Sequence, residues 1–198
     1  MRLTKLTDPT TLAVARSDVK DHLRIEQDEV DYDNDVDELI YAAMAYVMEE
    51  THHTLITTQY TAKWDCFPGD ILKIPAWPII SIDSIQYIDT DGATQTLSPA
   101  LYRTELVQCP ATIRPAIDDD WPDTLADAID SVTVTFTAGY GAAATDVPYM
   151  FRSMIKLLVG HWFKHREAIG SSNTPIKLAF NALRDQVRVN EWQEFLNQ

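Results

Sequence analysis

The spacing of the apolar residues changes twice along this chain, and this change constrains the fold more than any other feature. Between residues 36 and 48 apolar side chains recur every three or four positions, as on one face of an α-helix. From about residue 55 to residue 138 they mostly alternate with polar ones, as in half-buried strands, and a helical spacing returns after residue 146. The sequence therefore predicts an α+β fold with about four helices, in which a mainly antiparallel β insertion lies between the second and third helices.

These segments assign residues 1–198 to a single domain. A helical scaffold is expected at residues 17–53 and 146–198, and the β insertion at residues 55–138. The clearest strand runs from Ser131 to Thr137, because two valines and a phenylalanine alternate there with threonines. The residues expected at helix ends are Ser17, Asp33 or Asn34, and Asp146 as N-caps, and His52 and His53 at the C-terminus of the second helix.

Residues 147–167 are apolar on almost every side and carry only a thin polar stripe. A helix with this pattern is buried on most sides, either within its own fold or against a neighbouring subunit. Residues 176–189 show the spacing of a final amphipathic helix.

The charge of the chain restricts its partners. It has 16 lysines and arginines against 30 aspartates and glutamates, and its formal net charge is −14. DNA affinity comes largely from cations that neutralise phosphates, so this balance argues against a DNA-binding regulator. No apolar run reaches the ~20 residues that span a bilayer, and no export signal is expected, so we predict synthesis in the cytoplasm without a membrane partner.

Metal-binding and catalytic patterns are weak. The acidic stretch Asp31–Val36 begins like an EF-hand loop but lacks the glycine at its sixth position. His161 and His165 are spaced to chelate a metal from one helix, yet Trp162 stands where the zinc-protease pattern needs glutamate. We expect packing or interface histidines here, and we predict no enzyme activity, no cofactor and no metal ligand.

Several short motifs follow one another in a recognisable order. A strand ending in Gly139-Tyr140-Gly141 is followed by a Val147-Pro148 helix start and by a helix closing on His161-Trp162-Phe163. This order resembles that of the head–tail connector (adaptor) proteins of tailed bacteriophages and prophages. Phe163 replaces the usual tyrosine. Val19–Ile25 resembles the opening helix of the family, and the final helix departs most from its pattern. Four further segments of this chain resemble motifs in the family's β insertion: Asp65–Pro68, Ile74–Ile79, Ile85–Asp89 and Trp121-Pro122.

The resemblance implies a structural virion protein that forms a ring of about twelve copies beneath the portal. Such a ring extends the DNA channel, binds the portal on one side and offers a docking site to a downstream neck or tail protein. DNA passes through without specific binding. The protein would occupy the host cytoplasm during assembly and the neck of the mature virion. The residues expected at subunit or portal interfaces are Phe151, Ile155, Leu158, Trp162, Phe163, Arg166, Phe180, Leu183, Arg184 and Trp192.

An acidic lumen would repel DNA phosphates and let the genome slide. We therefore place Asp28, Asp31, Asp33 and Asp35 at the channel as a hypothesis. Three alternative functions stay open. The first is another neck or tail-completion protein of similar fold. The second is a metal-dependent enzyme using His161 and His165, and the third is a generic soluble binding module.

Overall fold

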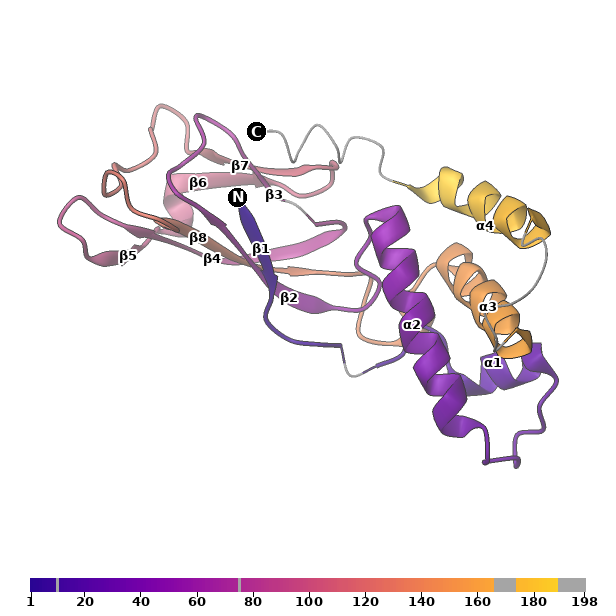
Figure 1. Cartoon of the computed structure of the whole chain (residues 1–198). Coiled ribbons are helices and arrows are strands. Elements are labelled where there is room, and N and C mark those ends of the chain that lie inside the picture. The colour runs from indigo at the N-terminus through magenta and orange to yellow at the C-terminus, as the bar shows by residue number, and fades with distance from the viewer. Residues whose placement is uncertain (10, 75, 166–173, 189–198) are drawn as a thin grey trace. The chain divides into compact units, whose positions relative to one another are not determined.

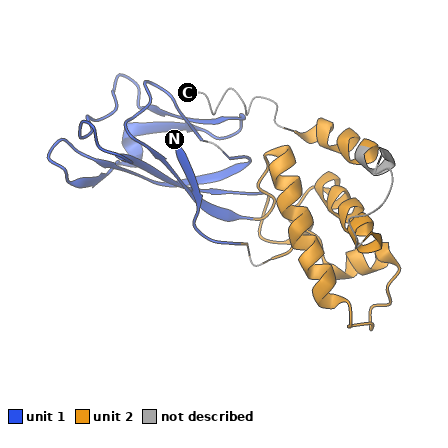
Figure 2. Ribbon diagram, in the orientation of Figure 1, with its two compact units in different colours: residues 1–8, 57–139, 190–198 blue, residues 9–56, 140–189 orange. Residues whose placement is uncertain are grey.

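The computed structural model describes residues 1–9, 11–74, 76–165 and 174–188. Its elements fall into two compact units, shown in different colours in Figure 2. The β unit contains Met1–Asp8 and Thr57–Gly139, and the helical unit contains Pro9–Ile56 together with the described part of 140–188. The predicted α+β class is confirmed, since four helices and two antiparallel sheets are present (Figure 1). That the whole chain forms a single domain stays a prediction.

The helical unit contains the four α-helices on one hydrophobic core. The second helix buries the face that its spacing predicted, with Val36, Ile40 and Val47 fully enclosed. Among the helices that the structure describes, none is long and apolar enough to cross a lipid bilayer. The helices are α1 (Arg16–Leu23), α2 (Asp33–Thr51), α3 (Tyr149–Lys164) and α4 (Thr174–Val187).

The N-caps predicted for the first two helices are wrong. Helix α1 begins one residue before Ser17, and no side chain caps it. Helix α2 begins at Asp33 itself, and neither Asp33 nor Asn34 makes a capping hydrogen bond. The carboxylate of Asp33 instead binds the side chains of Arg16 and Lys20, because charged partners brought close by the fold outcompete a neutral backbone donor.

The N-cap predicted for the third helix is also wrong. Helix α3 begins at Tyr149, directly after Pro148, and it has no side-chain cap. The carboxylate of Asp146 accepts a hydrogen bond of 2.9 Å from the backbone N–H of Ala143, at the start of the short 3₁₀ turn η2 (Ala144–Asp146). Asp146 therefore shapes the turn before the helix rather than the helix end.

The β unit contains two antiparallel sheets that share one buried cluster. The larger sheet has the strand order β1-β2-β8-β4-β5, and the smaller has the order β3-β7-β6. The 3₁₀ turn η1 (Pro99–Leu101) precedes β6. The strands are β1 (Arg2–Lys5), β2 (Thr58–Trp64), β3 (Leu72–Ile74), β4 (Ile79–Ile88), β5 (Thr94–Thr96), β6 (Tyr102–Glu105), β7 (Ala111–Pro115) and β8 (Val132–Ala138).

Strand β8 lies at the centre of the larger sheet, between β2 and β4. Its Val132, Val134 and Phe136 are fully buried while the intervening threonines are half-buried, as the alternation predicted. Strand β1 was not predicted. All four of its residues are exposed, so it carries no burial pattern, and only its pairing with β2 makes it a strand.

Candidate functional site

The two histidines of α3 lie close together, but no third metal-binding side chain joins them among the described residues. The ring centroids of His161 and His165 lie 4.7 Å apart. Within the part of the chain that the structure describes, no group of three histidines, cysteines or acidic residues is arranged to hold a metal ion. The described residues therefore give no support to the metal-dependent enzyme that this pair suggested.

Residues 149–158 of α3 supply much of the core of the helical unit. Phe151, Ile155 and Leu158 are buried against residues of α1 and α2. Their side chains are thus occupied within the helical unit, which accounts for the apolar character of this helix without a partner subunit. The interface role of these three residues stays a prediction. Because they are buried, they are weaker candidates for an interface than the other residues predicted there.

The second half of α3 carries aromatic side chains that are only partly covered. The ring of Trp162 meets Tyr46 edge-on at 6.3 Å between centroids, and that of Phe163 meets Tyr32 edge-on at 5.8 Å. Tyr46 and Tyr32 are 41% and 39% exposed, so aromatic surface of the helical unit faces solvent. We call these four residues the aromatic face.

Helix α4 extends this surface. Phe180 is buried and packs its ring against Tyr46 at 5.4 Å, while Leu183 is half-buried in the same core. Arg184 donates a hydrogen bond of 3.0 Å to a carboxylate oxygen of Glu50, which fastens α4 to the end of α2. Of the remaining residues predicted at an interface, Arg166 and Trp192 lie outside the described residues.

The acidic residues predicted at a channel lie in the helical unit, between α1 and the first turn of α2. Asp28, Asp31 and Asp35 are exposed, whereas Asp33 is half-buried. Asp33 belongs to an ion-pair network: its two carboxylate oxygens each lie 2.8 Å from a cation, Arg16 or Lys20. The four aspartates thus divide into three that face solvent and one that fixes the segment.

Lys20 holds this acidic segment in place, a role that no pattern in the sequence indicated. Its side chain is 3% exposed, and its ammonium group donates to the carbonyl oxygens of Gln27 and Glu29 as well as to Asp33, at 3.1, 2.6 and 2.8 Å. All three donors of the ammonium group are therefore used. The hydrogen bond from Lys20 is the main reason why the pKa of Asp33 is lowered from its ordinary value.

His53 joins three separate stretches of the helical unit. Its Nε2 lies 2.8 Å from the carbonyl oxygen of Val187, and its Nδ1 lies 2.8 Å from the hydroxyl of Tyr140. A carbonyl oxygen only accepts, so Nε2 carries the proton and Nδ1 accepts from the tyrosine. The end of α2, the turn after β8 and the end of α4 therefore meet at one buried imidazole. Both His52 and His53 were predicted at the C-terminus of α2. His52, with φ of 60°, takes the C-cap position as predicted, whereas His53 lies beyond it and binds Val187 and Tyr140.

Burial shifts both titrating groups of this cluster toward their neutral forms. It lowers the pKa of His53 and raises the pKa of Tyr140 to about 12. A neutral imidazole and a neutral phenol are what the hydrogen bonds require, so the directions of the two pKa shifts agree with the tautomer assigned to His53.

No protein-family model and no curated protein matches this chain. Solved structures do. A chain from the neck of an empty GTA particle, computed with sixfold symmetry, has a TM-score of 0.79 at 21% identity, over 96% of both chains. A chain from the virion of a native gene transfer agent (GTA) particle gives 0.76 at 21% identity, and one from the neck of the native particle, computed with twelvefold symmetry, gives 0.70 at 22%, each over 96% of both chains. At this identity the likeness shows that these chains share a fold.

Proposed function

We propose that this chain is a structural, non-enzymatic neck protein of a tailed phage, a prophage or a phage-like particle. More specifically, we propose a head–tail connector that forms a ring of about twelve copies beneath the portal and extends the DNA channel. One observation carries the proposal: the fold matches chains of particle necks over 96% of their length, with both units included. The order of the sequence motifs supports the same conclusion independently.

The helical unit offers a surface suited to a subunit or portal contact. The aromatic face and the neighbouring Leu183 leave apolar area partly exposed, and aromatic residues are enriched where protein partners meet. Arg184 lies beside this surface with its guanidinium held by Glu50. We therefore assign the contact chiefly to Trp162, Phe163, Leu183 and Arg184.

The exposed aspartates fit a conduit for DNA as well as a contact with protein. Carboxylates lining a channel repel phosphates, and salt screens this repulsion beyond about 8 Å at physiological ionic strength. Lys20 fixes the backbone from which Asp28 and Asp31 project, so their positions are defined before assembly. Their location at the lumen is part of this proposal.

Native mass spectrometry of this chain with the portal protein encoded near it tests the proposal. Each protein is weighed alone and in the mixture, over a range of salt concentrations. We expect portal rings to acquire a near-integral complement of this subunit. Failure to associate at any salt concentration, with both proteins folded, would contradict the connector role and favour a tail-side neck protein or an unrelated binding module.

A pair of variants tests where the contact lies. Phe163→Ser with Leu183→Ser removes apolar area from the proposed surface, and we expect it to lower the occupancy of portal rings. Leu101→Ser is the control, because Leu101 is a 45% exposed leucine in the β unit. Equal loss in both variants would show that the helical surface is not the contact.

A further inference from the structure

The smaller sheet of the β unit has one buried face and one cationic face. Leu72, Ile74 and Ile113 point into the shared core. The strand register defines the opposite face. Thr112 of the middle strand β7 pairs with Lys73 of β3 and with Glu105 of β6. Arg114 of β7 pairs with Arg103 of β6. Side chains opposite one another in a sheet share a face, so Lys73, Arg103 and Arg114 lie together. We call these three residues the cationic face.

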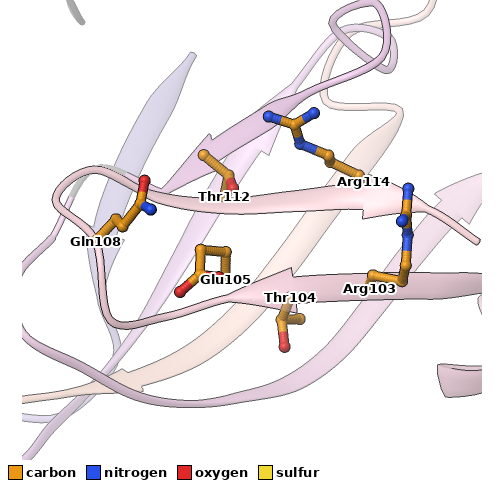
Figure 3. Close-up of a pocket in the computed structure, with 6 residues that line it drawn as sticks. All are labelled: Arg103, Thr104, Glu105, Gln108, Thr112 and Arg114. Atoms are coloured by element: carbon orange, nitrogen blue, oxygen red, sulfur yellow. The ribbon is translucent and has the colours of Figure 1, made fainter.

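Arg103 and Arg114 form an unfavourable pair within this face. Figure 3 shows both side chains rising from the same side of the β6–β7 hairpin. The Nε of Arg103 donates to the carbonyl oxygen of Pro115 at 3.0 Å, while the guanidinium of Arg114 makes no hydrogen bond or ion pair with any residue that the structure describes. Like charges directly opposite one another destabilise a sheet, so an anionic partner is the simplest compensation.

The cationic face also has room for such a partner. An open hollow of about 470 Å³ lies over the hairpin, and Arg103, Glu105, Thr112 and Arg114 contribute to its lining (Figure 3). Glu105 accepts a hydrogen bond of 3.3 Å from the backbone N–H of Val107, which turns part of its charge toward the loop. The hollow thus combines exposed guanidinium groups with polar side chains.

The same chain carries a surface of opposite charge. The loop between α1 and α2 presents the exposed carboxylates of Glu26, Asp28 and Asp31, and Lys20 fixes its backbone from beneath. Because the acidic loop belongs to the helical unit and the cationic face to the β unit, each copy holds two different and complementary patches. Two such patches are what a heterologous contact needs, and heterologous contacts that close by rotation produce rings.

We propose that the cationic face receives the acidic loop of a second copy of this chain. The inference rests on the proposed ring and names one of its contacts. It places Asp28 and Asp31 in that contact instead of at the lumen, and it leaves Asp35 as the exposed aspartate that can face the channel. It also explains how strongly acidic subunits come together, since each contact sets carboxylates of one copy against arginines of the next.

DNA is the competing anionic partner, and the observations favour it less. Among the residues that the structure describes, three cations share this face, and Glu105 lies among them. A net charge of −14 repels phosphates at long range, whereas a contact with another copy is made through the local patches.

Two charge-reversed variants and their mixture test the contact. The first is Arg103→Glu with Arg114→Glu, and the second is Asp28→Lys with Asp31→Lys. Each variant alone sets like charges against each other, so we expect each to lose assembly. In the mixture, the unchanged loop of the first meets the unchanged face of the second, and the reversed patches meet each other. We therefore expect the mixture to assemble into rings in which the two variants alternate.

The readout is native mass spectrometry with and without the portal protein, at low and at physiological salt. Lys5→Glu with Thr94→Glu and Thr96→Glu has the same net charge as the first variant, changes only exposed strand residues outside both patches, and should still assemble. The second variant makes the chain less acidic overall, so a net-charge effect alone would improve its assembly. Normal assembly of either variant alone, or failure of the mixture while the wild-type chain assembles, overturns the proposal.

The remaining outcomes separate this contact from the proposed function. Wild-type rings that form without the portal, and that need both patches, would support the contact even if the connector role fails. Intact rings that bind the portal but lose affinity for duplex DNA in the first variant would assign the cationic face to DNA. Absence of wild-type self-association both alone and on the portal would overturn the contact together with the ring.

Discussion

The hydrogen bond from Tyr140 to His53 is expected to stabilise the helical unit, and a single substitution can measure its contribution. Replacing Tyr140 with phenylalanine keeps the ring and removes only the hydroxyl that lies 2.8 Å from Nδ1 of His53. Nδ1 then remains a buried acceptor without a donor, because His53 is 7% exposed and its Nε2 is already bound to Val187. Leaving such a group unsatisfied costs about 1–3 kcal/mol. We expect the free energy of unfolding of the helical unit to fall by about 2 kcal/mol, near the middle of that range.

Urea unfolding followed by circular dichroism at 222 nm measures this change, because that signal comes mainly from the helices. With a denaturant slope of about 2 kcal/mol per M, the midpoint should fall by about 1 M. Tyr149→Phe is the matched control, since Tyr149 is 69% exposed at the start of α3 and should leave the midpoint unchanged. Equal midpoints for the two variants would refute the hydrogen bond and the tautomer assigned to His53.

Three further predictions follow from the same unit. Burial is the main cause that lowers the pKa values of His22, His52 and His53, so the unfolded chain takes up protons before the folded chain as the pH falls. The free energy of unfolding should therefore be constant above about pH 7 and should decrease below about pH 6.5, the pKa of an unperturbed histidine. Urea midpoints measured between pH 8 and pH 5 will show this decrease. Phe151→Ala should reduce the free energy of unfolding by about 3–5 kcal/mol because it opens the core, whereas Leu178→Ala, at a 67% exposed position, should change little. Lys20→Met should speed amide hydrogen exchange in residues 26–32 while leaving α3 protected, and unchanged exchange there would contradict the role given to its ammonium group.

The elements with a regular burial period could be predicted from the sequence. The helix bearing Val36 and Ile40 and the strand bearing Val132 and Phe136 lie where the spacing placed them, because each buries one continuous face in a core. The helix ends could not be predicted, because capping depends on which donors reach a carboxylate. The carboxylate of Asp33 forms ion pairs with cations of α1, and that of Asp146 accepts a hydrogen bond from the backbone of the preceding 3₁₀ turn.

The candidate site was harder to predict because its residues act across long stretches of chain. His53 reaches Val187, which is 134 positions away, and nothing local to either residue signals the contact. The pairing of Arg103 with Arg114 depends on the register of a hairpin whose loop contains no recognisable two-residue turn. Lys20 stands in a motif that resembles an opening helix, but only the fold shows that its ammonium group is enclosed.

The helical unit is assembled from chain on both sides of residues 57–139. The two parts meet where the backbone N–H of Tyr140 donates to the carbonyl oxygen of Leu55 at 3.2 Å. A ribosome therefore finishes every strand before it begins α3, so α1 and α2 wait without the helix that covers Val36 and Ile40. During that interval the nascent chain exposes apolar surface that a chaperone can bind. Because Leu55 and Tyr140 lie this close, we expect a short linker in place of residues 57–139 to join the helical unit into one continuous chain, once Met1–Asp8, whose strand pairs with β2, is removed as well.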